Sequence, residues 1–115
     1  MLPDKEFPRF KAATVQSSPV FLDAAKTARK AADLIGEAAR NGARLVVFPE
    51  VFIPGYPYWS WITDPVTGSA WFEKLVRSSV FLPGPEIETV CAAAAANDAY
   101  VVIGACEKIP NTMGT

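Results

Sequence analysis

Glu50 has the clearest chemical setting of any residue in this sequence. It is the only charged residue between Arg44 and Asp64, and it comes two positions after the apolar run Leu45–Phe48. The segment that follows, as far as Trp61, is rich in aromatic rings and prolines. A carboxyl group held among rings is poorly solvated, which raises its pKa and allows it to carry protons near neutral pH. Acid–base chemistry centred on one carboxylate is therefore one interpretation of this pattern.

Two interpretations of Glu50 remain open from this spacing. In the structural one, Glu50 caps a backbone N–H or pairs with an arginine, and the aromatic residues are ordinary core. In the functional one, Glu50 is a proton carrier at the carboxyl end of a buried strand, where open α/β sheets place their sites.

Alternating strands and helices must position this carboxylate. The pattern predicts strands at Phe10–Gln16, Leu45–Phe48 and Tyr100–Gly104, and helices from Asp23 to about Arg40, over Ser69–Ser79, and from Pro85 to about Asn97. We expect Asp23 to cap the first helix, whose inner face holds Ala24, Ala28, Ala31, Ile35 and Ala38, and we expect the inner side of the last helix to hold Ile87, Val90, Cys91, Ala94 and Ala95. Asp64–Gly68 is expected to form a turn, and Pro110–Thr115 a loop. A strand, a helix of about 17 residues and a second strand imply parallel pairing with a right-handed crossover. The fold class expected from this order is α/β.

The residues around Glu50 also resemble a known family signature. They are Gly42, Leu45, Val46, Phe48, Glu50, Ile53, Gly55, Tyr56 and Pro57. Their order and spacing resemble the motif around the first catalytic residue of the nitrilases, which are carbon–nitrogen hydrolases with a Cys–Glu–Lys triad. The aromatic continuation Tyr58–Trp61 looks more like the nitrile-hydrolysing branch than the amidase or carbamylase branch. The resemblance runs from Phe10 to the last residues, but it covers only about the first third of such an enzyme.

This resemblance implies a partial αββα sandwich of the nitrilase superfamily. Residues 1–115 would form the N-terminal part of a single carbon–nitrogen hydrolase domain, with residues 1–9 as a flexible tail. The facing sheet of the sandwich would be missing, so we expect apolar surface to be exposed.

The resemblance also implies roles for individual residues. Glu50 would act as general base for a cysteine thiol that attacks a nitrile, and would later deliver protons to the nitrogen and activate water. Tyr56 and Trp59 are candidates for substrate binding. The alternative for Tyr56 is simple packing of its ring, and the alternative for Trp59 is a place at a subunit contact. The catalytic Lys and Cys would lie beyond Thr115, so the isolated chain is expected to be inactive. No cofactor or metal is implied.

The other reactive side chains favour structural interpretations. Cys91 is expected to be a small buried hydrophobe on its helix, and Cys106 to be an inert thiol beside a strand. Lys74 and Lys108 are expected to be solvated charges. Gly55 is expected to serve a backbone conformation rather than chemistry.

Composition excludes several other functions. The net charge is −1 without a basic cluster, so nucleic acid and anionic membranes gain no support as partners. There is no histidine, which rules out a Ser-His-Asp triad or a His-ligated zinc site within this chain. The charged N-terminus does not resemble a signal peptide, and a cytoplasmic location is the expectation.

By resemblance, the full-length protein would be a homo-oligomer acting on a small nitrile. Two alternatives stay open: an enzyme of the amidase or carbamylase branch, or a truncated chain without catalysis.

Overall fold

The computed structural model describes residues 7–112, which form three strands, three α-helices and one short 3-10 helix. In chain order these are β1 (Lys11–Thr14), α1 (Ala24–Arg40), β2 (Ala43–Val47), η1 (Tyr58–Trp61), α2 (Ser69–Ser78), α3 (Pro85–Ala96) and β3 (Tyr100–Val102). Each predicted strand and helix is present, and the helix bounds agree within one or two residues. Strands β1 and β3 are shorter than expected, whereas β2 begins two residues earlier and ends one residue earlier than predicted. The 3-10 helix was not predicted.

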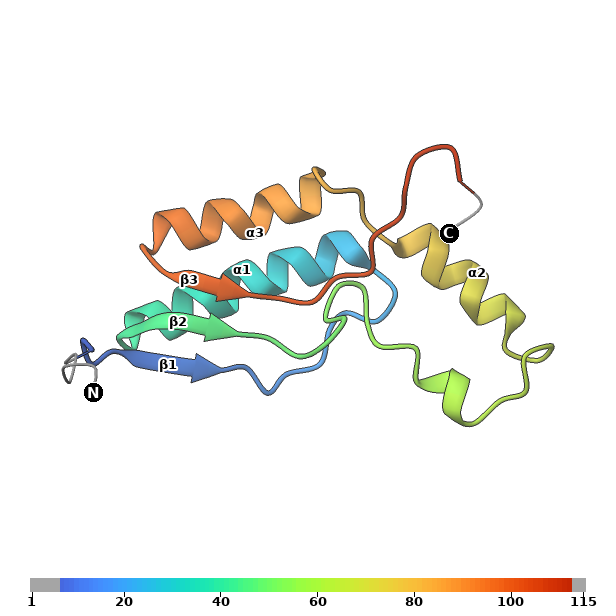
Figure 1. The fold of residues 1–115 in the computed structure, drawn as a ribbon, viewed down its shortest axis with the longest axis horizontal. Coiled ribbons are helices and arrows are strands. Elements are labelled where there is room, and N and C mark those ends of the chain that lie inside the picture. The colour runs from blue at the N-terminus through green and yellow to red at the C-terminus, as the bar shows by residue number, and fades with distance from the viewer. Residues whose placement is uncertain (1–6, 113–115) are drawn as a thin grey trace, which may run out of the picture.

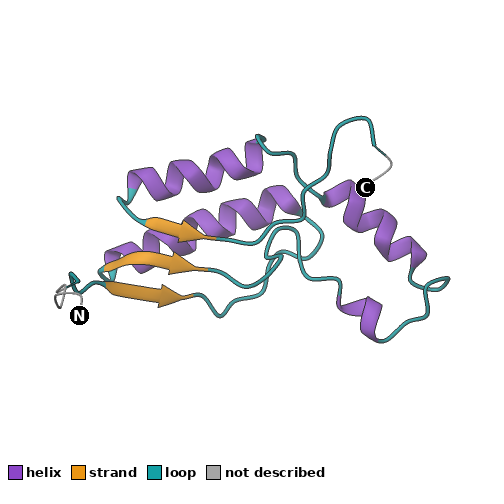
Figure 2. Cartoon of the chain, viewed as in Figure 1, coloured by secondary structure: helices purple, strands orange, loops and turns teal. Residues whose placement is uncertain are grey.

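The three strands form one parallel sheet in the order β1-β2-β3. Ala13 lies opposite Val46, and Val46 lies opposite Val101, so these three side chains share one face of the sheet. The helices α1 and α3 lie side by side over this face, as Figures 1 and 2 show. The predicted α/β architecture is therefore confirmed as a partial, one-sided layer of helix on sheet.

Helix α1 follows directly from its sequence. The Asp23 side chain accepts a hydrogen bond from the Lys26 N–H at 2.9 Å, which caps the first turn as predicted. Ala28, Ala31 and Ile35 are fully buried at helical spacing. Because alanine has a small side chain, this face lets the helix axis lie close to the sheet.

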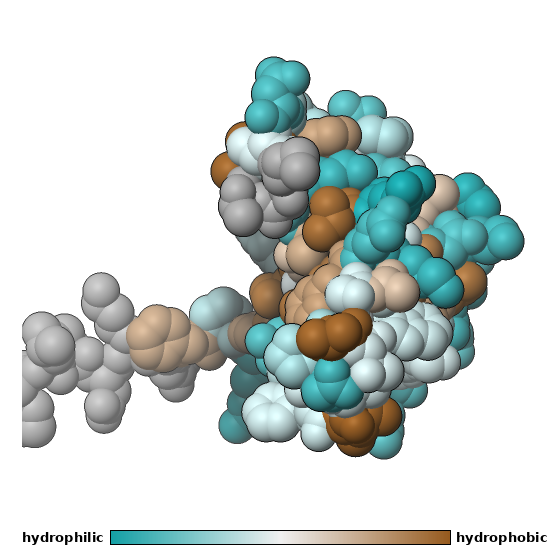
Figure 3. Space-filling view, turned by 90° about the vertical axis from the view of Figure 1, so that its right-hand side faces the viewer, coloured by the Kyte–Doolittle hydropathy of each residue, from teal (hydrophilic) through white to brown (hydrophobic). Residues whose placement is uncertain are grey.

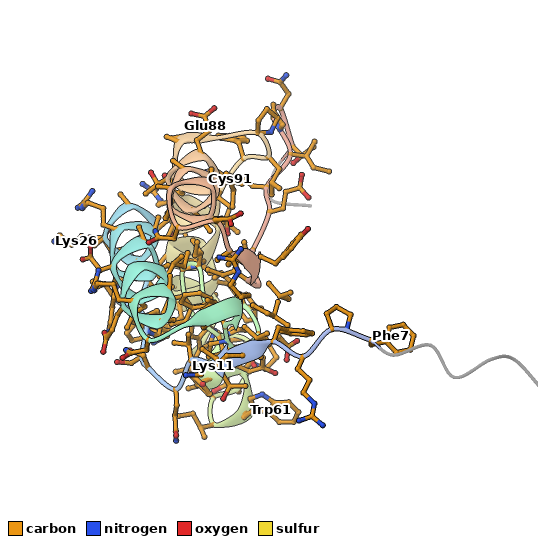
Figure 4. All side chains as sticks on the ribbon, turned by 90° about the vertical axis from the view of Figure 1, so that its left-hand side faces the viewer. Phe7, Lys11, Lys26, Trp61, Glu88 and Cys91 are labelled. Carbon is orange, nitrogen blue, oxygen red and sulfur yellow. The ribbon has the colours of Figure 1, made fainter. Side chains whose placement is uncertain are left out.

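Helix α3 is rotated relative to the prediction. Val90 is buried and Ile87 is half-buried, but Cys91 is exposed on the helix surface (Figure 4). The prediction that Cys91 is a buried hydrophobe is wrong, as is the inward placement of Ala95, which is exposed. Five consecutive alanines make the helix apolar on nearly every side, so hydrophobic periodicity gives little information about which side faces inward.

The second face of the sheet carries apolar side chains that none of the described helices covers. Leu45 lies opposite Tyr100, and Val47 lies opposite Val102, on the face away from α1 and α3. Tyr100 and Val102 are 82% and 57% exposed. This agrees with the apolar exposure expected from the sequence.

Residues 58–78, which contain η1 and α2, form an arm that projects from the sheet and its helices (Figure 1). Figure 3 shows hydrophobic side chains between polar ones at the end of the molecule where α2 lies. Trp61 and Ile62 are 76% and 83% exposed. The predicted turn before α2 is present, with the Asp64 carboxylate accepting hydrogen bonds from the Val66 and Thr67 N–H groups.

Two predictions about the chain ends fall largely outside the described residues. Of the predicted tail, only residues 7–9 are described, and all three are exposed; Phe7 points away from the sheet and helices in Figure 4. The predicted C-terminal loop is described only as far as Thr112.

Candidate functional site

Glu50 lies on a looped-out turn after the carboxyl end of β2. The Phe48 N–H donates to the Val102 carbonyl at 2.8 Å, and the Ile53 N–H donates to the Gly104 carbonyl at 3.2 Å. Between these two hydrogen bonds, the chain after β2 advances five residues, from 48 to 53, whereas the chain along β3 advances only two, from 102 to 104. The intervening residues 49–52, here called the Glu50 turn, leave the sheet as an enlarged bulge. This device turns the Glu50 side chain out of the ladder.

Both ends of the Glu50 turn are fixed in the core. The rings of Phe48 and Phe52 pack with their centroids 5.1 Å apart, and Phe52 is only 1% exposed. The Ile53 carbonyl accepts a hydrogen bond from the Cys106 N–H at 2.8 Å. This bond pairs the end of the turn with residues 103–106, here called the extension of β3. The carboxylate is therefore carried by a rigid backbone.

Val51 adopts a left-handed backbone conformation, with φ of 46°. A β-branched residue is rare in this region and costs about 1–3 kcal/mol there. Such a conformation persists only where the surrounding structure enforces it, and here it directly follows the candidate catalytic residue. The backbone strain at Val51 therefore lies directly beside Glu50, whose side-chain direction depends on this part of the main chain.

Glu50 contributes to a pocket of about 150 Å³ between the Glu50 turn and the segment that follows β1. The pocket is lined by Ser17, Ser18, Pro19, Pro49, Glu50, Val51, Phe52, Tyr56 and Tyr58. Glu50 is exposed, and the three ion pairs among residues 7–112 do not include it. The pocket joins the carboxyl ends of neighbouring parallel strands, as expected of an α/β site.

The prediction that Glu50 is held in a dry, ring-lined recess is wrong for this chain. Most of the aromatic residues predicted to surround the carboxylate pack elsewhere. Trp59 packs within the arm and does not line the pocket. Phe52 lines the pocket, but its ring is buried in the core. Tyr56 and Tyr58 are therefore the two rings that face the pocket beside Glu50. The remaining side of the pocket is open to solvent.

Tyr56 is the predicted binding residue that the structure brings to Glu50. It is half-buried, lines the same pocket, and its ring centroid lies 5.0 Å from that of Tyr58. The two rings form one wall, and a phenol in this position is available to a ligand beside the carboxylate.

Trp59 lies in a separate aromatic cluster. It is 5% exposed, stacks on Trp71 with centroids 5.9 Å apart, and meets Phe72 edge-on at 5.5 Å. Its Nε1 is buried and has no hydrogen-bond partner among the described residues. A second pocket, of about 360 Å³, lies beside this cluster and shares Tyr58 with the Glu50 pocket. Trp59 is thus adjacent to the Glu50 pocket without lining it.

Gly55 holds the chain in a conformation that requires glycine. Its φ is 139°, and a Cβ at this position would lie 2.6 Å from the Phe21 ring. This agrees with a backbone role for Gly55. It allows the chain to turn from the buried Ile53 and Pro54 toward Tyr56.

The cysteines and lysines singled out in the sequence lie away from the Glu50 pocket. Cys91 is exposed on α3, and Cys106 is half-buried beyond β3. Lys74 lies over the Trp71 ring at 4.6 Å, and Lys108 lies over the Phe81 ring at 4.9 Å. None of the four lines the pocket, so residues 7–112 bring neither a thiol nor an ammonium group to Glu50.

Two surface carboxyl groups have shifted pKa values with structural causes. The Lys26 N–H lowers the pKa of Asp23, and the Thr67 hydroxyl and N–H lower the pKa of Asp64. Both groups stabilise the start of a helix or turn, and neither lines the Glu50 pocket.

Between residues 7 and 112, no group of three or more His, Cys, Asp or Glu side chains is arranged to hold a metal ion. The same residues contain no helix that combines the length and the hydropathy needed to span a membrane.

A one-sided parallel α/β layer with a carboxylate turned out at a strand end defines this chain as part of a layered α/β domain with a strand-end site. The carbon–nitrogen hydrolase family model matches residues 11–114, and the chain belongs to this family.

Curated relatives place the chain near the nitrilases. It is 46% identical over 100 residues to an aliphatic nitrilase of Rhodococcus rhodochrous, covering 86% of this chain and 27% of the relative. It is 38% identical over 102 residues to a nitrilase of Bacillus sp. (strain OxB-1), covering 89% and 30%. It is 41% identical over 103 residues to an arylacetonitrilase of Aspergillus oryzae, covering 90% and 30%. The chain thus spans less than a third of the length of these relatives.

Sequence reasoning missed two residues that shape the site, Val51 and Gly104. Valine gives no sequence signal for a positive φ, since it disfavours that region. Gly104 did carry a signal, because a glycine at the end of a strand often marks a close approach of another backbone segment.

Proposed function

We propose that the protein containing this chain is a nitrile hydrolase in which Glu50 acts as the general base. The observation that supports this most directly is the Glu50 turn, which fixes a carboxylate beside Tyr56 at the mouth of a strand-end pocket. The similarity to several nitrilases supports nitriles as the substrate class.

In the proposed reaction, a cysteine and a lysine from sequence beyond Thr115 complete the site. Glu50 accepts the thiol proton as sulfur bonds to the nitrile carbon, and the proton passes to the nitrogen to give a thioimidate. Water adds, ammonia leaves, and a thioester remains. A second water, deprotonated by Glu50, releases the carboxylic acid and regenerates the thiol. The overall balance is one nitrile and two waters to one acid and one ammonia.

The exposure of Glu50 fits this proposal if later sequence covers the pocket. The chain spans 27% to 30% of the relatives described above, and the sheet face that carries Tyr100 and Val102 has no covering layer among residues 7–112. A layer on that side would shield Glu50 from water, as the enclosed site of a proton carrier requires. Tyr56 and Tyr58 would then form one wall of an enclosed substrate site, with Trp59 behind Tyr58.

The first test is Glu50→Gln in the full-length protein, assayed for ammonia release from aliphatic and arylaceto-nitriles. The amide has nearly the same size but neither accepts nor releases a proton near neutral pH, so we expect turnover to fall by about 10²–10⁴-fold with the unfolding midpoint unchanged. Glu88→Gln is the matched control, because Glu88 is exposed on α3 and points away from the sheet (Figure 4). Its activity should stay at the wild-type level.

Two outcomes would contradict the proposal. Near-normal turnover by Glu50→Gln would make Glu50 structural. Hydrolysis of amides or carbamoyl compounds without any nitrile turnover would place the protein in another branch of the family. We propose that residues 1–115 alone are inactive. Turnover by a pure preparation of these residues would contradict the proposal that a cysteine and a lysine from later sequence complete the site.

We also propose that the full-length protein is a cytoplasmic homo-oligomer. Cell fractionation would test the location, and light scattering would test the oligomeric state.

A further inference from the structure

Gly104 lies in unusually close contact with the backbone of the Glu50 turn. A Cβ placed on Gly104 would lie 2.5 Å from the Val51 nitrogen, 3.2 Å from the Glu50 carbonyl carbon and 3.3 Å from the Glu50 Cα. All three atoms belong to the main chain, so no side-chain rotation relieves the overlap.

Gly104 is not needed for an unusual φ. Gly42 and Gly55 are the glycines with positive φ in the described part of the chain, and Gly104 is not among them. Its missing side chain therefore provides space, and the segment that uses this space is the Glu50 turn.

The close contact completes the fixation of the turn. The Gly104 carbonyl accepts the Ile53 N–H at 3.2 Å, and the Phe48 N–H donates to Val102. Between these two hydrogen bonds, Val51 is left-handed and rests against Gly104. The main chain of Glu50 and Val51 sets the direction of the Glu50 Cα–Cβ bond, so a shift of this contact re-aims the carboxylate.

We infer that Gly104 is a positioning residue for Glu50, holding the carboxylate toward its pocket by letting the Glu50 turn lie directly on the extension of β3. This inference rests on the proposed function. Ordinary van der Waals contact with a Cβ begins at 3.4 Å, so an added methyl group must move the turn by about 1 Å. A displacement of that size at a reacting group costs about 10²-fold in rate.

The test is a double-mutant cycle in the full-length protein with Gly104→Ala and Glu50→Gln. Gly104→Ala alone lowers kcat about 10- to 100-fold with a smaller change in KM, because the wall formed by Tyr56 and Tyr58 stays in place while the turn that carries Glu50 moves. In the Glu50→Gln background the same substitution lowers kcat less than twofold, since the group that it displaces is already inactive. Losses that multiply would show that Gly104 acts only on general structure and would overturn the inference.

Gly84→Ala is the matched control for a backbone clash. A Cβ at Gly84 would lie 2.5 Å from the Phe81 carbonyl oxygen, but Gly84 precedes α3 and does not line the Glu50 pocket. We expect a comparable fall in the unfolding midpoint, whereas kcat of the folded enzyme stays within about threefold of wild type. A loss of kcat in Gly84→Ala equal to that in Gly104→Ala would overturn the inference.

If Gly104→Ala does not fold, Val51→Gly tests the same contact without adding an atom. Glycine tolerates positive φ and loosens the turn, so kcat falls about tenfold, and this loss disappears in the Glu50→Gln background. A multiplicative loss overturns the inference. Full activity of Gly104→Ala beside an inactive Glu50→Gln would refute the positioning role alone, whereas full activity of Glu50→Gln would refute the proposed function.

Discussion

The Glu50 turn and the arm of residues 58–78 are both aromatic extensions of the sheet, but they are fixed in different ways. The turn is hydrogen-bonded at both ends to the extension of β3, and its anchor Phe52 is completely enclosed. The arm is held by stacking of its own rings, such as Trp59 on Trp71, and by side-chain contacts to the segment before α1, where Phe21 meets Trp59 and the Ser78 hydroxyl donates to the Leu22 carbonyl. The difference shows that the chain supports the carboxylate through main-chain hydrogen bonds and a buried anchor, whereas the neighbouring apolar arm is held through its side chains.

The largest effect should come from removing the anchor of the turn. Phe52→Ala empties a fully buried site against Phe48, so we expect a loss of about 3–5 kcal/mol in the free energy of unfolding, with loss of turnover. Denaturant titration of the full-length protein measures it. A cost below about 1 kcal/mol would break the comparison, because the turn would then be no more tightly fixed than the arm.

A smaller effect is expected in the arm. Trp71 is 40% exposed, and Trp71→Ala removes one stacked partner of Trp59, so the expected loss is about 1 kcal/mol. Trp61→Ala is the control, because Trp61 is 76% exposed, and its change should stay within about 0.5 kcal/mol. A loss for Trp71→Ala as large as that for Phe52→Ala would mean that the arm belongs to the core.

The smallest effect concerns the turn that begins α2. Hydrogen bonds from the Thr67 hydroxyl and N–H hold the pKa of Asp64 below its ordinary value of 3.8. The stabilisation is therefore complete above about pH 3.8 and disappears as the pH falls through the lowered pKa. The stability curves of wild type and Asp64→Asn should differ near neutral pH and converge below pH 3.8. Curves that stay parallel down to pH 2 would remove Asp64 as a support of the arm.

The sequence predicted the strands and the first helix because each has a hydrophobic spacing that fits only one orientation in the fold. Asp23 and the alanine face of α1 are examples, and both lie where they were expected. The orientation of α3 was not predictable, because a run of alanines has no distinct inner side. The exposure of Cys91 follows from this ambiguity.

The site was predicted in position but not in surroundings. The place of Glu50 after a buried strand follows from local sequence, and so does its proximity to Tyr56 six residues later. Its exposure depends on how distant segments pack. Trp59 packs against Trp71 and Phe72, which follow it by more than ten residues, and therefore does not cover the Glu50 pocket.

The uncovered side of the sheet has a practical consequence for anyone who prepares this chain by itself. Within residues 7–112, the outer strands β1 and β3 each have one edge without a strand partner, and one face of the sheet exposes Tyr100 and Val102 beside Leu45. An exposed apolar sheet face with unpaired strand edges favours aggregation, both by face-to-face packing of copies and by strand pairing between copies. We therefore expect the amount of soluble protein to fall steeply as the preparation is concentrated, although the helices remain folded.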